Sequence, residues 1–400
     1  MIQPRELLEL VREHGSPLYV YDLGEVKARI ARLRALFPDF KLSYAMKANP
    51  HPEVVSLMRH RVDHLDVSSG GELRTALDLG WEPDRVSFTG PGKTRDEISA
   101  SVAAAGSFQI VESVDEAILA NRVASDQGRV HRILVRLSPN ASPPGFGVRM
   151  SGRPTQFGLD EDDWPEGLRR IAEQGNLEVK GFHIYSGTQS LQGSAVVDNF
   201  EIMADSFSRC AEILGIHPDL LVFGTGFGVP YHDGMEALDV EEVSAGATRL
   251  VARLRRDPRL ADAQLLLELG RWLVGPAGQY LVTVLYTKRS HGQEIAICDG
   301  GMHHNLAAAG HLGGVIHRNY RMENLSSRAE PAPDGSKGTY RVVGSLCTSI
   351  DLLGNAVELD RISAGDVLAI KNSGAYGLTA SPVNFISHPP AEEVTVDSGP

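Results

Sequence analysis

The stretch KLSYAMKANP, residues 41–50, is a short apolar run that reaches Lys47 and is followed at once by Asn49-Pro50. A run bounded by such a turn signal predicts a strand over Lys41–Tyr44, with Lys47 at its end. Lysines held in partly desolvated pockets at strand ends have a lowered pKa and can form Schiff bases. A solvated lysine is the alternative, because charged side chains are mostly exposed, and this stretch alone leaves both readings open.

Similar apolar runs occur on both sides of residues 41–50, and helical patterns such as Glu25–Leu36 and Ser206–Leu214 separate many of them. This β–α alternation over roughly 250 residues predicts an α/β fold, a TIM-like parallel (β/α)8 barrel, with a doubly wound open sheet as the competing architecture. The other expected strands are Leu18–Tyr21, Val86–Thr89, Phe108–Val111, Arg132–Leu137, Glu178–Tyr185, Leu220–Phe223 and Gln264–Glu268.

After about Gly275 the pattern changes to short strands separated by glycine and proline turns, with few helical periods. This predicts a second, mostly antiparallel β domain. We expect the segment Ser326–Thr339, which is rich in Pro, Ser and Gly, to be a surface loop. The expected strands of this domain are Tyr280–Tyr286, Glu294–Cys298, Tyr340–Val343 and Val367–Lys371.

Composition excludes several classes of protein. The chain has 400 residues, is 42% hydrophobic and carries a net charge of −12, so it can bury a full core and lacks the basic excess that nucleic acids or anionic membranes require. Its three cysteines, Cys210, Cys298 and Cys347, are not a disulfide framework. With no signal-like N-terminus and no long apolar segment, we expect a cytoplasmic protein with reduced thiols.

Two motifs combine glycines or charges with the ends of apolar strands. In VFGTGFGVPY, residues 222–231, the glycines at 224, 226 and 228 could let backbone N–H groups close on a phosphate, or could form a tight turn. In LLLELGRW, residues 265–272, Glu268 ends a strand and Arg271 follows. They could form a salt bridge with each other, or Glu268 could pair with a protonated pyridine nitrogen while Arg271 meets a phosphate.

The C-terminal part adds three weaker signals. Cys347 and Asp351 lie four residues apart in VVGSLCTSIDLL, where the cysteine could be inert packing or a proton donor. Tyr376, between glycines, could reach a phosphate or lie at an interface. The histidines at 303, 304 and 311 lack a carboxylate or cysteine at metal-ligand spacing, so we expect no metal.

The order of these motifs is more specific than any one of them. The series YAMKAN, GFHIYSGTQ, GTGFGVPY, ELGR, CDGGMHH, GSLCTSID and SGAYG, over about residues 17–390, resembles the fold-type III decarboxylases that use pyridoxal 5′-phosphate, a group that includes ornithine and diaminopimelate decarboxylases. The resemblance implies a cofactor-binding barrel over residues 24–272, a β domain from 1–23 and 273–400, and a homodimer with shared active sites.

The resemblance also implies a role for individual residues. Lys47 matches the lysine that holds the cofactor as a Schiff base, Glu268 the acid that pairs with the pyridine nitrogen, and Cys347 a proton donor contributed, with the substrate-binding Asp351, by the partner subunit. The remaining implied cofactor contacts are Asp66, Arg136, His183, Tyr185, Gly226, Phe227, Gly228, Arg271 and Tyr376.

Three departures from the family pattern bear on function. Tyr185 stands where the family has a histidine that stacks on the cofactor ring, so either Tyr185 or His183 could lie against that ring. The usual E-P-G-R is ELGR here, a change confined to the turn. Thr348, in CTSID, replaces the glutamate with which diaminopimelate decarboxylases read the far end of their substrate.

The expected activity is therefore removal of the α-carboxylate from an amino acid or amino-acid conjugate. The Thr348 departure, with GRPTQFG (152–158) and the GAYGLTASPVNFISHP ending, resembles the secondary-metabolism branch that acts on citryl-diaminopropionate or carrier-protein-bound glutamate in siderophore or antibiotic assembly. A diaminopimelate or ornithine decarboxylase of primary metabolism, an amino-acid racemase and a non-catalytic homologue that binds the cofactor are the alternatives.

Overall fold

The computed structural model describes residues 2–311, 318–329 and 336–399. Its internal contacts divide the chain into two compact units. The barrel unit contains Ile30–Gly228 and Ala237–Gly270, and the β unit contains Met1–Arg29, Val229–Glu236 and Arg271–Pro400. The division falls inside helix α2 (Leu23–Leu36).

Within the described residues of the barrel unit, eight parallel strands form a closed ring, in which each strand pairs with the next and β12 pairs with β2. This confirms the predicted (β/α)8 barrel and excludes the open doubly wound sheet. The strands are β2 (Phe40–Ala45), β3 (His64–Val67), β4 (Val86–Phe88), β5 (Phe108–Val111), β6 (His131–Ser138), β9 (Leu177–Ile184), β11 (Leu220–Gly224) and β12 (Gln264–Leu269).

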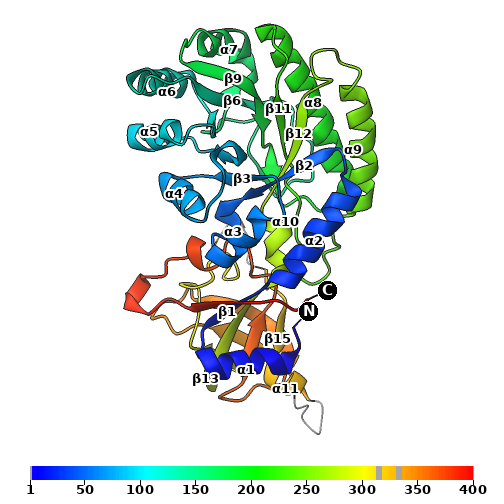
Figure 1. Cartoon of the computed structure of the whole chain (residues 1–400). Coiled ribbons are helices and arrows are strands. Elements are labelled where there is room, and N and C mark those ends of the chain that lie inside the picture. Colours follow the sequence, from blue (N-terminus) through cyan, green and yellow to red (C-terminus); the bar gives the residue numbers. More distant parts are fainter. Residues whose placement is uncertain (1, 312–317, 330–335, 400) are drawn as a thin grey trace. The chain divides into compact units, whose positions relative to one another are not determined.

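Helices cover the outside of these strands (Figure 1). Most begin with a serine, threonine or aspartate that caps the first turn, as Ser69, Ser113 and Asp239 do. The helix expected at Ser206–Leu214 begins much earlier, at Gly193. The helices are α3 (Pro52–Arg59), α4 (Gly70–Asp78), α5 (Arg95–Ala103), α6 (Val114–Asp126), α7 (Trp164–Ala172), α8 (Gly193–Leu214) and α9 (Val240–Leu254).

The barrel interior is filled by apolar side chains from strands on opposite sides of the ring. Ile110, Leu134, Val222 and Leu266, from β5, β6, β11 and β12, form one buried cluster. Because side chains on a strand alternate with a period of two, the residues two positions further along these strands face the same interior. On β5, β6 and β12 the residues two positions beyond this apolar layer are charged. They lie at the carboxyl ends of the strands, where barrel enzymes place their active sites.

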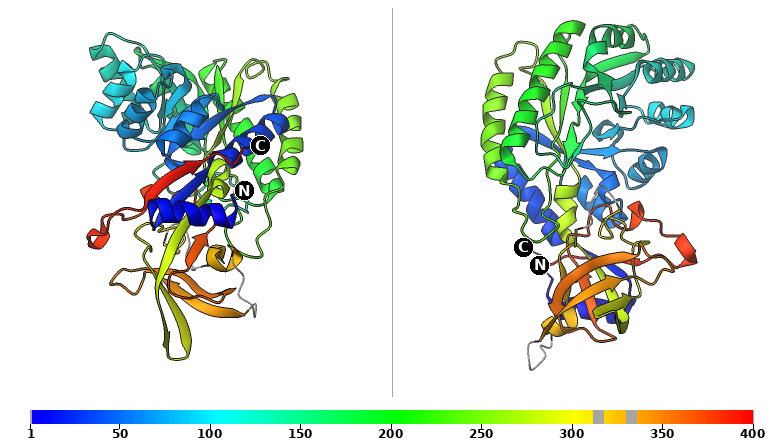
Figure 2. Two further views of the ribbon diagram at one scale, coloured as in Figure 1. Left: turned by 60° about the horizontal axis from the view of Figure 1, so that its bottom comes forward. Right: turned by 180° about the vertical axis from the view of Figure 1, so that it is seen from behind.

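The β unit contains a mostly antiparallel sheet, as predicted. Strand β1 (Leu18–Asp22), predicted at Leu18–Tyr21, belongs to this sheet, where it pairs with β13 and β19. Figure 2 shows β13 and β14 continuing together as a two-stranded ribbon. The other strands are β13 (Gly278–Ser290), β14 (Gln293–Cys298), β15 (Met322–Asn324), β16 (Lys337–Val343), β17 (Leu352–Asp360), β18 (Val367–Ile370) and β19 (Glu392–Val396).

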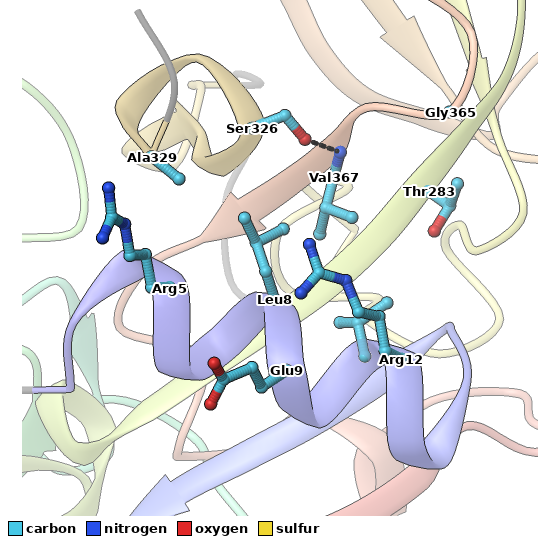
Figure 3. Close-up of a pocket in the computed structure, with 10 residues that line it drawn as sticks. Arg5, Leu8, Glu9, Arg12, Thr283, Ser326, Ala329, Gly365 and Val367 are labelled. Atoms are coloured by element: carbon cyan, nitrogen blue, oxygen red, sulfur yellow. Dashed lines mark hydrogen bonds between the residues drawn. The ribbon is translucent and has the colours of Figure 1, made fainter.

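Helix α1 (Pro4–His14) lies on this sheet and buries Leu7 against Val20, Leu281 and Ala369. Beside it is a cavity of about 470 Å³, and Figure 3 shows Leu8 of α1 pointing into it toward Val367. The apolar stripe of this helix thus completes the core of the β unit.

The loop expected at Ser326–Thr339 is partly wrong. Ser326–Ala329 belong to helix α11 (Leu325–Ala329), and 337–339 belong to β16, while 330–335 lie outside the described residues. No helix in the described part of the chain is both long and apolar enough to cross a bilayer.

Candidate active site

Polar residues gather at the carboxyl ends of the barrel strands. Asp66 is the next-to-last residue of β3, and His183 and Glu268 hold the same position in β9 and β12. Lys47 lies just beyond β2, in the 3-10 turn η1 (Met46–Ala48). Strand register aligns Arg136 of β6 with His183. The structure therefore brings together five residues that are far apart in the sequence.

Asp66 is fully buried between neighbouring strands. Its Oδ1 accepts hydrogen bonds from the hydroxyls of Ser87, at 2.8 Å, and Thr89. Burial raises the pKa of Asp66 to about 8, and the nearby charge of Glu268 adds to this effect, while the charge of Lys47 and the two hydroxyls oppose it. The raised pKa favours the protonated form of this carboxyl group near neutral pH.

Glu268 behaves in the opposite way. Its Oε2 lies 3.3 Å from Nε2 of His183, and both side chains are buried. Burial favours a raised pKa for Glu268, but His183 and the charges of Lys47 and Arg136 outweigh burial and hold this pKa below its usual range. An ionised carboxylate in a closed barrel interior suits a cationic partner such as a pyridinium nitrogen.

Lys47 is exposed at the mouth of the barrel, and its charge acts on the carboxyl groups of Asp66, Glu72 and Glu268. Glu72, which sequence reasoning missed, is mostly buried and accepts the backbone N–H of Ser68 at 2.6 Å. Its place as the third residue of α4, after the cap Ser69, resembles an ordinary capping pattern, which conceals any further role.

The two candidates for the ring-stacking position differ in their surroundings. The His183 ring is directed toward Glu268, and its Nδ1 has no hydrogen-bond partner in the described chain. Tyr185 is half-buried and follows β9, and a Cβ at Gly224 would lie 2.3 Å from its ring. Tyr185 therefore lies directly against the end of β11, where the glycine loop begins.

Glycines in that loop allow it to approach the segment after β9. The backbone N–H of Ser190 donates to the carbonyl of Gly226 at 3.0 Å, and that of Gly228 donates to the carbonyl of Ser190 at 2.8 Å. A Cβ at Gly226, which has φ +63°, would lie 2.4 Å from the carbonyl oxygen of Gly187. The structure thus provides a packing reason for these glycines, and the close backbone also suits a phosphate. The adjacent Phe227 is buried.

The buried polar atoms at this end of the barrel that have no hydrogen-bond partner in the described residues include four from β2, β3, β9 and the residues that follow β9. They are Oδ2 of Asp66, Nδ1 of His183, Oγ of Ser43 and Oγ of Ser186. Buried polar groups are normally satisfied, so such a cluster indicates a polar ligand. Its donors and acceptors fit the expected pyridoxal phosphate, and Ser43, in register with Glu268, was missed because a lone serine in an apolar strand is a weak signal.

In the β unit, Arg271 lies among tyrosines. Its Nη1 donates to the hydroxyl of Tyr231 at 2.8 Å, and its guanidinium lies 4.6 Å from the ring centroid of Tyr376. Its Nε is buried with no hydrogen-bond partner in the described chain. Two predicted phosphate contacts, Arg271 and Tyr376, are therefore neighbours, and Tyr231 is an additional residue that the sequence did not indicate.

Cys347 and Asp351 lie in the loop between β16 and β17 of the β unit. Cys347 is exposed. Asp351 is buried, and its carboxylate accepts the backbone N–H groups of Met302, at 2.7 Å, and Leu346, at 2.9 Å. The aspartate thus fixes the loop that presents Cys347 to solvent.

The histidine run has local partners. His304 lies within hydrogen-bonding distance of the hydroxyl of Tyr280 and of the carbonyl of Pro389, and its ring contacts that of His303. His311 lies 3.0 Å from the carbonyl oxygen of Ile350. Within the ranges that the structure describes, no group of three or more His, Cys, Asp or Glu side chains is placed to hold a metal.

Comparison with known proteins agrees with this geometry. The family description "Pyridoxal-dependent decarboxylase, pyridoxal binding domain" matches residues 23–275. The L-glutamyl-[BtrI acyl-carrier protein] decarboxylase of Niallia circulans is 32% identical over 395 residues, which cover 98% of this chain and 92% of that protein.

Two further relatives also span nearly the whole chain. The 2-[(L-alanin-3-ylcarbamoyl)methyl]-2-hydroxybutanedioate decarboxylase of Staphylococcus aureus is 28% identical and covers 98% of this chain and 97% of its own length. The crystal structure of diaminopimelate decarboxylase from M. jannaschii superposes with a TM-score of 0.88 at 26% identity, over 98% of this chain and 89% of that chain.

Proposed function

From the premise that this chain belongs to the pyridoxal-dependent decarboxylase family, a group of carboxy-lyases whose cofactor is pyridoxal 5′-phosphate, we propose that it removes the α-carboxylate of an amino-acid unit attached to a larger conjugate. The bound cofactor supplies a ring that accepts the electrons released when carbon dioxide departs. The pathway we propose is the assembly of a siderophore or another secondary metabolite.

The paired behaviour of Asp66 and Glu268 is the observation that supports decarboxylation best. We assign Lys47 as the residue that holds the cofactor aldehyde covalently and Glu268 as the carboxylate that keeps a proton on the pyridine nitrogen. An ionised Glu268 is needed for that task, and His183, Lys47 and Arg136 favour its ionised form. Asp66 and Arg136 would line the surroundings of the cofactor, and His183 or Tyr185 would lie against its ring.

The phosphate is assigned to backbone groups and to two side chains. The backbone of Gly226, Phe227 and Gly228 would surround it, as the close approach of this loop to Ser190 suggests. Arg271 and Tyr376, which are neighbours in the β unit, would supply further contacts. A guanidinium with an unpaired buried Nε is suited to an anionic ligand.

A second copy of the chain would complete the site. Cys347 is exposed on a loop held by Asp351, so it is available to another molecule rather than buried in its own unit. We assign Cys347 of a partner subunit as the acid that returns a proton to the α-carbon, with Asp351 at the substrate end of that loop. The assembly we propose is a homodimer with shared active sites.

Thr348 is the observation that favours a conjugate over free diaminopimelate. Threonine stands in CTSID where a glutamate would recognise the distal ammonium group of diaminopimelate. Relatives from Niallia circulans and Staphylococcus aureus act, by their names, on a carrier-bound glutamate and on a citrate-type conjugate. The similarity to diaminopimelate decarboxylases supports the alternative substrate, meso-diaminopimelate.

Carbon dioxide release from a panel of substrates tests both the decarboxylase activity and the substrate that we propose. The panel contains carrier-bound glutamate, citryl-diaminopropionate, ornithine, lysine, diaminobutyrate and meso-diaminopimelate. We expect turnover of one conjugate and none of meso-diaminopimelate, with Thr348→Glu as the variant that restores a carboxylate for the free diamino acid. Turnover of diaminopimelate alone would contradict the substrate assignment.

The role of Lys47 has its own test. Lys47→Ala should abolish carbon dioxide release and also the visible absorbance of the covalently held cofactor, because no other amine of the barrel is assigned to the aldehyde. A Lys47→Ala protein that retained turnover would refute the catalytic assignment, whichever substrate is used.

A further inference from the structure

Glu112 is a buried carboxylate to which the sequence motifs assign no role. It follows β5 directly, and only 2% of its side chain is exposed. Its Oε2 accepts a hydrogen bond from Nη1 of Arg136 at 2.9 Å, and its Oε1 accepts the backbone N–H of Gly90 at 2.8 Å. Each oxygen thus holds a different part of the barrel end.

The contact with Gly90 leads to Asp66. Gly90 follows Thr89, whose hydroxyl donates to Oδ1 of Asp66. The backbone N–H of Thr89 donates to the carbonyl of Val67 at 2.8 Å, beside Asp66 on β3. Because Gly90 has φ +142°, a conformation that few residues other than glycine adopt, this turn needs an anchor, and Glu112 provides one.

The contact with Arg136 leads to Glu268. Arg136 is aligned with His183 across β6 and β9, and Nε2 of His183 lies 3.3 Å from Oε2 of Glu268. The guanidinium of Arg136 also lies 4.5 Å from the ring centroid of Phe157, and its charge contributes to the low pKa of Glu268. Without Glu112, the buried guanidinium would have to be compensated by Glu268 itself.

A second buried ion pair holds Glu112 in place. Glu116 accepts the backbone N–H of Glu112 at 3.0 Å and pairs with Lys93 at 2.8 Å, and the exposed fractions of the Lys93 and Glu116 side chains are 1% and 9%. Lys93 also donates to the carbonyl of Gly90 at 2.6 Å. Glu112 is therefore fixed at its backbone as well as at both carboxylate oxygens.

We propose that Glu112 is a positioning residue that couples the two central carboxyl groups of the site, because one of its oxygens anchors the turn that orients Asp66 and the other holds the guanidinium that acts on Glu268. This inference rests on the proposed function, since it gives Glu268 the pyridine nitrogen as its partner. Because Glu112 pairs with Arg136 at 2.9 Å, Glu268 is left free for that nitrogen.

The test compares Glu112→Gln with the wild-type holoenzyme by titrating the visible absorbance of the lysine-bound cofactor against pH. Glutamine removes a negative charge that offsets Arg136, so the protonated cofactor linkage is disfavoured and the titration midpoint should fall by about one pH unit. The kcat should fall by about 10–100-fold, as for other residues that orient catalytic groups, with KM changed less than about threefold. Glu112→Asp, which keeps the charge, should bring the midpoint at least halfway back to the wild-type value.

Asp63→Asn is the matched control, because it removes a barrel carboxylate whose ion pair with Arg34, at 2.7 Å, involves none of the residues that hold Glu112. It should lower the melting temperature of the cofactor-free protein without moving the titration midpoint. Equal midpoints for Glu112→Gln, Asp63→Asn and wild type would overturn the inference. If Glu112→Gln does not fold, the isosteric pair Glu112→Asp and Glu112→Asn is compared instead, and equal midpoints and equal kcat in these two variants overturn the inference.

The proposed function fails by a different result. If Glu112→Gln changes nothing but Lys47→Ala still loses the cofactor absorbance, the inference fails and the proposed function stands. Retained absorbance in Lys47→Ala removes the proposed function and with it the partner that the inference assigns to Glu268.

Discussion

At the scale of single residues, Asp66 and Glu268 are two buried carboxyl groups whose pKa values shift in opposite directions. Burial and the charge of Glu268 raise the pKa of Asp66 to about 8, whereas His183, Lys47 and Arg136 outweigh burial at Glu268. Opposite shifts in neighbouring groups are typical of sites where one group holds a proton and the other a charge.

This difference predicts that Asp66→Asn is tolerated better than Asp66→Ala. Asparagine is neutral and keeps an oxygen for the hydroxyls of Ser87 and Thr89, so kcat near neutral pH should stay within about tenfold of wild type. Above about pH 8 the wild-type carboxyl group loses its proton and the asparagine does not, so a profile of kcat/KM against pH should lose its inflection near 8 in Asp66→Asn.

Asp66→Ala serves as the control, because it removes the whole carboxyl group and with it the acceptor for the two hydroxyls. It should reduce kcat more than Asp66→Asn does. An inflection near pH 8 that persists unchanged in Asp66→Asn would assign that titration to another group.

Residues were predictable from sequence where a charge interrupts an apolar strand. Leu266 and Glu268 lie two positions apart, and so do Leu134 and Arg136, so the strand period places each charge above the barrel core. Glu112 follows the same rule after Ile110, but a glutamate beside Ser113 resembles the start of a helix. Ser43 and Ser186 carry no charge, and only their lack of hydrogen-bond partners in the described structure marks them.

At the scale of elements, the loop after β11 depends on glycine for two physical reasons that can be separated. Gly226 has φ +63°, and a Cβ there would lie 2.4 Å from a backbone oxygen. Gly215, which ends α8, has φ +64°, and among the described residues no atom beyond its chain neighbours lies within 4 Å of a Cβ built on it. The two positions share the left-handed backbone, but only Gly226 adds a steric clash.

We therefore expect Gly215→Ala to lower the free energy of unfolding by about 1 kcal/mol, which is the usual effect of a left-handed alanine. Gly226→Ala should lower it more, and it should also weaken pyridoxal phosphate binding at least about tenfold because the contact with Ser190 must open. Denaturant unfolding and cofactor titration measure the two effects. Equal losses in both variants, with equal cofactor affinity, would show that the close approach is unimportant.

Element boundaries were less predictable than element order. The sequence indicated only the last part of α8, Ser206–Leu214, although the helix begins at Gly193. Its first turns were missed because they mix Ser, Asp and Asn with apolar residues and contain no acidic residue in the first turn. Short strands such as β15, with three residues, depend on pairing with β18 rather than on local pattern.

At the scale of the whole molecule, the sequence indicates two sheets, but not which strands far apart in the chain pair. Strand β1 precedes the barrel in sequence and pairs with β13 and β19, which follow it. Hydrophobic pattern identifies a strand, whereas its partner depends on contacts that only the complete chain can supply. The order of the motifs indicated the barrel and the second domain, because it rests on motifs from the whole length of the chain.

The two units also differ in the probes they contain, which allows the barrel to be followed by itself. The chain has three tryptophans. Trp81 and Trp164 are buried in the barrel unit and Trp272 belongs to the β unit. In a Trp272→Phe background, tryptophan fluorescence therefore reports the unfolding of the barrel alone, which avoids treating a molecule of two units as a single transition.

His131 makes the stability of the barrel sensitive to acid. It is buried at the start of β6, and burial lowers its pKa to about 4, whereas a histidine in an unfolded chain titrates near 6.5. Between these values the unfolded state binds a proton that the folded state does not, so stability falls as pH decreases. The slope should be up to about 1.4 kcal/mol per pH unit, and the effect ends below about pH 4, where both states are protonated.

His131→Gln removes this titration and keeps a polar atom within reach of the Ser101 hydroxyl, which lies 3.5 Å from the imidazole Nε2. Urea unfolding at pH 7, 6 and 5 should therefore show a variant that loses less stability on acidification than the wild type, by roughly 2 kcal/mol across that interval. His217→Gln, at an exposed position of the same unit, should reproduce the wild-type dependence. If the plots of unfolding free energy against pH were parallel for His131→Gln and wild type, His131 would not be the source of the acid sensitivity. The carboxyl groups of the barrel would be the source instead, because paired carboxylates also lose their stabilising charge as pH decreases.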